Sequence, residues 1–276
     1  MLAENQWLCL SSALQTFTAR LLENSDGALA RLDAGGVRLD SRPMEDAWGD
    51  PIPQMEMRDD GVAIVPVSGV LSVGVTPFEK WAFGLTDYRD IRADVDEAVM
   101  QGAKLIVFEM NSPGGSVAGL HETAEFIAQM ADVVSMCKFN GILSCSAAEY
   151  LTAAVSPAFA TASAINGSIG ARAQKIDLTG FLEKAGIKVE TYISGKFKNV
   201  GDPYSTTTKE QAEFIQASID DCGAAFRDWM RLNRGDSIPD DAMEGQTLKT
   251  EQAIFAGLVD DQCGCLDDAI ARSAGE

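Results

Sequence analysis

The stretch Lys104-Leu-Ile-Val-Phe-Glu-Met-Asn-Ser-Pro-Gly-Gly-Ser116 decides the fold of this chain of 276 residues. Its first part, 104–110, is a short apolar run rich in β-branched residues, which predicts a buried strand. The remainder, 111–116, is a turn sequence, and a helical pattern over 117–130 follows it directly. Strands that lead into helices in this way are typical of α/β domains with mainly parallel strands.

The same alternation continues on both sides of this stretch. We predict further strands over 61–69, 133–139, 159–161 and 188–193, and further helices over 88–101, 146–155, 178–185 and 208–232. The sequence therefore predicts one α/β domain over residues 60–276, with helices on the faces of the sheet.

The first 59 residues have a different character. Apolar residues recur at helical spacing over 3–24, which predicts an amphipathic helix. Residues 24–59 then combine glycines, three prolines and many acids, as expected of a linker or arm. The Gly, Pro and Asp content of this linker also suggests that the chain cleaves itself there.

Charge and composition limit the kinds of partner and cofactor that this chain could bind. Lys and Arg number 22 against 41 Asp and Glu, so the formal charge is −19, which disfavours nucleic acid and anionic membrane surfaces. Neither a secretory signal nor an apolar stretch long enough to span a bilayer is apparent, so we expect a cytoplasmic protein. The six scattered cysteines indicate reduced thiols and no metal site. No cofactor is expected.

Two small-residue motifs could carry chemistry. Glycines in Asn111-Ser-Pro-Gly-Gly-Ser116 would let backbone N–H groups face an anion, as in an oxyanion hole, although a tight turn needs glycine for steric reasons alone. In Leu143-Ser-Cys-Ser-Ala-Ala-Glu-Tyr150, a nucleophilic Ser146 would begin a helix, with the amide of Ala147 pointing at the same oxyanion. A simple helix cap is the alternative for Ser146.

The third motif offers a base. Ser194-Gly-Lys-Phe-Lys-Asn199 follows the predicted strand over 188–193, which would leave Lys198 near the core. A lysine base must be partly desolvated, because its pKa has to fall from about 10.4 to roughly 7–8. The only histidine, His121, would have to serve any Ser-His-Asp triad, and we expect it instead to be an ordinary helix residue.

Together these segments resemble the signal peptide peptidase A family of Ser/Lys peptidases, in the Clp-protease and crotonase superfamily. The resemblance implies stacked ββα units and ring-like homo-oligomers. It assigns Ser146 as nucleophile, Lys198 rather than Lys196 as base, and Ser168 of Asn166-Gly-Ser-Ile-Gly170 as the hydrogen-bond partner of that lysine. Gly114 and Gly115 become oxyanion-hole donors, and 253–260 fits the closing strand of the family.

Within this family the sequence is most similar to the head-maturation proteases (minor capsid protein C) of tailed phages. Ser144-Cys-Ser-Ala147 and Gly201-Asp-Pro-Tyr-Ser205 carry that likeness. It implies an endopeptidase that processes scaffold, capsid or portal proteins in the host cytoplasm, inside an assembling prohead. Ala147-Ala148 departs from the usual Gly-Gly or Ala-Gly. Phage relatives often carry a scaffold segment after the protease; here we expect either a scaffold that is a separate protein or a sequence that is the protease portion only.

Two alternatives stay open. One is a bacterial cytosolic peptidase with the same dyad and other substrates. The other is a catalytically inactive crotonase-like scaffold or acyl-CoA-binding protein, although the acidic sequence shows no cationic pocket for the CoA phosphates.

Overall fold

The computed structural model describes residues 7–9, 45–46 and 49–275. Within these ranges ten strands form one sheet. The strands are β1 (Trp7–Cys9), β2 (Glu56–Met57), β3 (Val62–Ser72), β4 (Thr86–Asp87), β5 (Leu105–Ser116), β6 (Ser135–Cys145), β7 (Ala158–Ala160), β8 (Ile165–Gly167), β9 (Thr247–Lys249) and β10 (Asp261–Gln262). The helices are α2 (Pro77–Phe83), α3 (Tyr88–Met100), α4 (Leu120–Met130), α5 (Ala147–Leu151), α6 (Thr179–Lys184), α7 (Lys209–Arg234), the 3₁₀ turn η1 (Asp240–Met243), α8 (Thr250–Phe255) and α9 (Leu266–Ala274).

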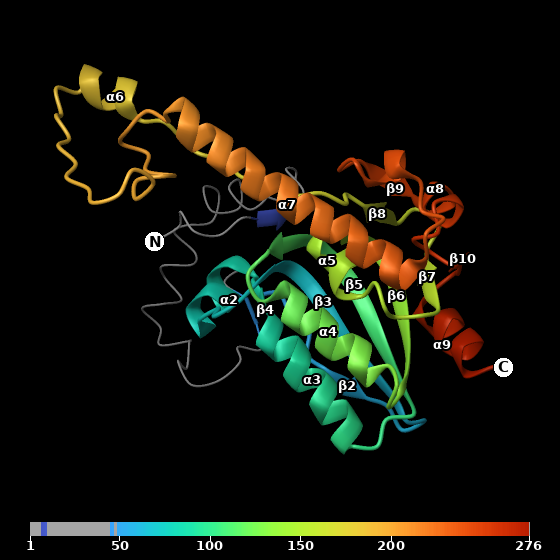
Figure 1. The fold of residues 1–276 in the computed structure, drawn as a ribbon. Coiled ribbons are helices and arrows are strands. Elements are labelled where there is room, and N and C mark those ends of the chain that lie inside the picture. The colour runs from blue at the N-terminus through green and yellow to red at the C-terminus, as the bar shows by residue number, and fades with distance from the viewer. Residues whose placement is uncertain (1–6, 10–44, 47–48, 276) are drawn as a thin grey trace.

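The centre of the sheet is parallel, which confirms the predicted fold class. Its order is β10-β7-β6-β5-β3-β2, and every neighbouring pair from β10 to β3 runs parallel. Short strands add to this core, with β8 parallel to β6 and β9 antiparallel to β8. Figure 1 shows α3 and α4 packed side by side over the long strands β3, β5 and β6.

Both faces of the central strands are buried. Ile106 and Phe108 of β5 pack with α3 and α4, whereas the alternate residues Leu105 and Val107 pack in a second cluster with α9. This double burial explains why β5 is a continuous apolar run rather than an alternating one.

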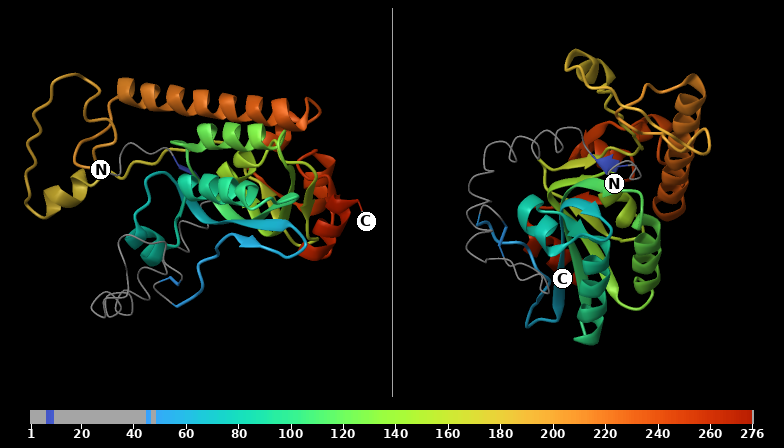
Figure 2. Two further views of the ribbon diagram at one scale, coloured as in Figure 1. Left: turned by 90° about the horizontal axis from the view of Figure 1, so that it is seen from below. Right: turned by 90° about the vertical axis from the view of Figure 1, so that its left-hand side faces the viewer.

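Helix α7 joins the domain to a projecting arm (172–208). Its C-terminal half is anchored, because Phe226 and Met230 are each 1% exposed, whereas Phe214 near its other end is 52% exposed. The arm, which includes α6, extends away from the sheet and projects past the N-terminal end of α7 (Figures 1 and 2).

Several predicted elements differ from the structure. The strand predicted over 188–193 is wrong, because these residues are exposed and form no strand pairing. The closing strand expected over 253–260 is also wrong, since α8 occupies its first part and β10 follows only at Asp261. Trp7–Cys9 is a strand where a helix was predicted, and the rest of 3–24 lies outside the described residues.

Candidate active site

Ser146 occupies a strained turn between a strand and a helix. β6 ends at Cys145, α5 begins at Ala147, and Ser146 between them has φ 55° and ψ −119°. A residue other than glycine adopts such a backbone only when its surroundings impose it, at about 1–3 kcal/mol. The side chain of Ser146 makes no capping hydrogen bond, so the helix-cap alternative is wrong. This geometry resembles the elbow that presents a nucleophilic serine.

Ser168 lies directly beside this turn. β8 runs parallel to β6 with Cys145 opposite Gly167, and the Ser146 N–H donates to the Gly167 carbonyl at 2.8 Å. Ser168 is therefore the next residue in the same register. It also has a positive φ, of 54°, and its N–H donates to the Gln246 carbonyl at 2.7 Å. Both serines are thus held by backbone contacts at the ends of neighbouring strands.

The glycine motif is the end of a strand rather than a turn. β5 continues through Gly114 and Gly115 to Ser116, and α4 begins only at Leu120. A Cβ on Gly115 would lie 1.9 Å from the Leu71 carbonyl oxygen of β3, so the close strand pairing itself requires glycine there. The Gly114 N–H donates to Ser112 Oγ at 3.1 Å, and Gly115 lies in the strand pairing opposite Leu71 of β3.

The topology brings the glycines and Ser146 to the same edge. β6 pairs with β5 as far as Ser112 opposite Ser144, and two residues farther along each chain lie Gly114 and Ser146. Because parallel strands end at the same edge of a sheet, the candidates on β5, β6 and β8 meet there. The residues gathered at this edge are Gly114, Gly115, Ser146, Ala147 and Ser168.

Lys198 is not brought to this edge within one chain. It lies exposed on a turn of the projecting arm, where its N–H donates to the Gly195 carbonyl at 3.0 Å. Contacts of the surrounding loop go to the start of α7, where Gln211 bonds the Lys196 carbonyl and Asn199. The prediction that a preceding strand leaves Lys198 near the core is therefore wrong.

A buried ion pair beneath α5 was not predicted. Lys138 Nζ donates to Glu149 Oε2 at 2.7 Å, and both side chains are only 2% exposed. Cys145 lies close enough to sense both charges. Its thiol pKa is raised to about 12, chiefly by burial and then by the Glu149 carboxylate, with Lys138 acting in the opposite direction. A lysine inside the apolar strand predicted over 133–139 was the signal that could have revealed the pair.

His121 belongs to an aromatic cluster rather than a triad. Its Nδ1 lies 2.8 Å from the Tyr150 hydroxyl, and its ring meets Trp229 edge-on at 5.2 Å. Tyr150 in turn stacks on Trp229 at 5.3 Å. This cluster joins α4, α5 and α7 to one another. His121 is therefore an ordinary helix residue near the site, as predicted.

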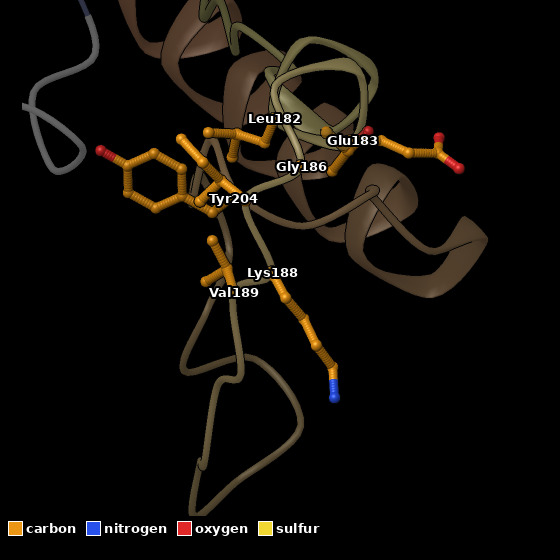
Figure 3. A pocket seen from close by; sticks show the side chains of 8 residues that line it. Leu182, Glu183, Gly186, Lys188, Val189 and Tyr204 are labelled. Atoms are coloured by element: carbon orange, nitrogen blue, oxygen red, sulfur yellow. The ribbon is translucent and has the colours of Figure 1, made fainter.

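The hollow shown in Figure 3 is separate from these residues. It has a volume of about 390 Å³ and lies wholly in the arm, between α6 and the chain around Val189 and Tyr204. Leu182, Val189 and Tyr204 gather there, while the charged ends of Glu183 and Lys188 point away (Figure 3). The hollow is therefore a feature of the arm surface and not part of the candidate active site.

The described part of the chain contains neither a cluster of metal ligands nor a helix that could span a membrane. No group of three or more His, Cys, Asp or Glu side chains converges there as metal ligands. Among the same residues, no helix combines the length and the apolar character that crossing a bilayer requires.

Comparison with known proteins supports the resemblance drawn from the motifs. The chain is 29% identical over 212 residues to "Capsid assembly protease C" of Escherichia phage lambda, covering 76% of this chain and 47% of that protein. It is 28% identical over 218 residues to "Head-tail preconnector protein GP5" of Enterobacteria phage P21, covering 78% and 42%. The chain thus spans less than half the length of each relative.

A family model completes the comparison. The model of peptidase family S49 matches residues 133–276, which is just over half of the chain and includes Ser146, Ser168 and Lys198. The expected relation to signal peptide peptidases and phage head proteases is thereby confirmed. This chain belongs to peptidase family S49.

Proposed function

We propose that this chain is a serine endopeptidase whose nucleophile is Ser146. The observation that carries the proposal is the strained, non-capping Ser146 at a sheet edge shared with Gly114, Gly115 and Ser168. A serine without a catalytic role has no reason to keep such a strained backbone, whereas this turn is the one that positions nucleophilic serines in other hydrolases. Membership of a peptidase family supports the same activity.

The mechanism uses a lysine base. Ser146 Oγ attacks the peptide carbonyl while its proton passes to neutral Lys198, which Ser168 holds by a hydrogen bond. The N–H groups of Ala147 and of Gly115 or Gly114 stabilise the tetrahedral oxyanion. The ammonium of Lys198 then returns the proton to the leaving amine. Water hydrolyses the acyl-enzyme in the second half, giving its proton first to Lys198 and then to Ser146 Oγ.

We infer that Lys198 comes from a neighbouring copy in a ring-like homo-oligomer. Within one chain Lys198 lies exposed on a turn of the arm, whose neighbouring residues contact the start of α7. The arm also displays an unusual number of exposed apolar side chains, which mark a protein interface. They are Ile176, Phe181, Ile187, Val189, Tyr192, Ile193 and Tyr204.

The proposed substrates are scaffold, capsid or portal proteins of an assembling phage head. Support comes from the names of the two relatives, a capsid assembly protease and a head-tail preconnector protein. Cytoplasmic action inside the prohead belongs to the same proposal. Co-expression with candidate capsid and portal proteins should give defined cleavage products with wild type and none with Ser146→Ala.

A fluorophosphonate probe tests the chemistry, with the labelled residue mapped by mass spectrometry. We expect label on Ser146 in wild type and in the control variants Ser144→Ala and Lys196→Ala, and none in Ser146→Ala or Lys198→Ala. Labelling that persists in Lys198→Ala would refute the dyad. Unlabelled wild type, under conditions in which it forms its oligomer, would refute the peptidase assignment and favour the inactive scaffold.

Mixed oligomers of two inactive variants test which chain supplies the lysine of each site. When Ser146→Ala and Lys198→Ala chains are dissociated and reassembled together, sites that combine an intact serine with the intact lysine of a neighbour regain labelling. Random mixing of equal amounts should restore about a quarter of the wild-type sites. No recovery from verified mixed oligomers would show that each chain supplies its own lysine.

A further inference from the structure

The short strand β1 pairs with the glycine edge of β5. It runs antiparallel, with Trp7 opposite Ser116, Leu8 opposite Gly115 and Cys9 opposite Gly114. In Figure 1, β1 lies at the end of the sheet where α5 begins. The N-terminal segment of the chain therefore reaches the same part of β5 that we assign to the active site.

The topology fixes which edge of β5 is used. Gly114 and Gly115 already pair with Val70 and Leu71 of β3 on one side. A strand has only two edges, so β1 must occupy the other one, along which β6 pairs as far as Ser112. β6 separates from that edge after Cys145, where the Ser146 turn begins. β1 pairs with β5 in the position beyond it.

An unpaired strand edge beside a nucleophile is suited to bind a peptide. Such an edge offers a row of backbone N–H and C=O groups, and an added antiparallel strand satisfies them whatever its sequence. A substrate bound in this way would need the backbone groups of Gly114–Ser116 that β1 uses.

We propose that the segment Trp7–Cys9 is an internal occupant of the peptide-binding edge and competes with substrate for it. This inference rests on the proposed function, because the competition matters only if peptides reach Ser146. Only three residues of β1 are paired. The contact is therefore short enough for a longer substrate strand to displace it, so the segment slows peptide entry without closing the site.

The test compares Leu8→Pro with Leu8→Ala in the full chain. Proline lacks the N–H and disfavours pairing by its neighbours, whereas alanine keeps the backbone groups. Two probes are used on each variant: a small fluorophosphonate, which needs no strand pairing, and an extended peptidyl phosphonate, which does. Loss of one or two net hydrogen bonds should speed peptide-probe labelling of Ser146 roughly 3- to 10-fold in Leu8→Pro. Fluorophosphonate labelling should be equal in both variants, and Leu8→Ala should match wild type.

Amide hydrogen exchange provides a readout that does not depend on catalysis. In wild type and in Ser146→Ala, peptides that contain Trp7–Cys9 and Gly114–Ser116 should be protected. Leu8→Pro should lose the protection of Trp7–Cys9 and lower that of Gly114–Ser116, whose pairing with β3 remains. Equal exchange in Leu8→Pro and Leu8→Ala would show that the pairing is absent and would overturn the inference. Lost protection with unchanged peptide labelling would also overturn it, because the strand would then not compete. Absence of all labelling with the exchange pattern intact would instead refute only the peptidase assignment.

Discussion

Glu149, three residues after Ser146, holds the buried ammonium of Lys138 with a single carboxylate oxygen. The Nζ–Oε2 distance is 2.7 Å. Its other oxygen, Oε1, is buried and has no hydrogen-bond partner among the described residues. The first turn of α5 is thus tied to the middle of β6 by a charge pair that water does not reach. This contact links the turn that positions Ser146 to the sheet beneath it.

Lys138→Met should therefore be strongly destabilising. Removing one partner of a buried pair leaves the other charge uncompensated, at a cost of about 3–5 kcal/mol. The double variant Lys138→Met/Glu149→Leu should recover most of that loss, because no charge is then left in the core. Urea unfolding of the single and double variants measures both values. A single variant as stable as wild type would contradict the burial of this pair.

Gly115→Ala should separate β3 from β5. The added methyl would lie 1.9 Å from the Leu71 carbonyl oxygen, which belongs to backbone and cannot rotate away. Overpacking of this kind costs about 1–3 kcal/mol and should also abolish labelling of Ser146. Gly180→Ala in α6 is the matched control, since a Cβ there meets nothing within 4 Å. Its free energy of unfolding should stay the same or rise slightly.

Ser168→Ala should slow catalysis without unfolding the protein. If Ser168 orients the lysine base, losing a hydrogen bond of about 1.5–3 kcal/mol reduces kcat roughly 10- to 100-fold, with KM little changed. Ser144→Ala is the control, because Ser144 Oγ is buried and has no hydrogen-bond partner in the described part of the chain. Kinetics on a peptide substrate separate the two variants. Equal kcat values would remove Ser168 from the mechanism.

Cys145 should resist alkylation in the folded protein. Burial raises its thiol pKa to about 12, and the neighbouring Glu149 carboxylate adds to the shift. The unfolded chain, with a thiol pKa near 8.5, loses this proton first as the pH rises. The contribution of Cys145 to stability is therefore intact below about pH 8.5 and declines toward pH 12. Iodoacetamide at pH 8.5 should modify the exposed Cys265 and spare Cys145 until urea is added.

The sequence predicts the central fold because its signals are local. The apolar run 104–110 corresponds to β5, which is buried on both faces, and the helical pattern over 88–101 corresponds to α3, which is buried on one face. The strand predicted over 188–193 is wrong because a strand also depends on a partner, which the local pattern does not reveal. Its pattern suits a strand, but in the described part of the chain these residues pair with no other strand.

The candidate site is only partly predictable. Small residues around Ser146 indicate a nucleophile turn, but the choice between nucleophile and helix cap depends on its φ of 55°, which sequence does not reveal. The pairing of β1 with Gly114–Ser116 links residues more than a hundred positions apart and carries no motif. The position of Lys198 depends on where α7 holds the arm. The lysine motif itself carries no information about that position.

The length and anchoring of helix α7 have a consequence for the proposed enzyme. Trp229 donates its indole N–H to the Tyr150 carbonyl of α5 at 2.9 Å, so one end of the helix is clamped to the nucleophile turn. Its 26 residues span ~39 Å, and the opposite end supports the arm. If Lys198 serves a neighbouring copy, as proposed, the helix is a spacer of fixed length between the serine that a chain keeps and the lysine that it supplies to the next. The proposed enzyme would then be controlled by its own local concentration: dilute chains would be inactive, and hydrolysis would start only where copies are packed together.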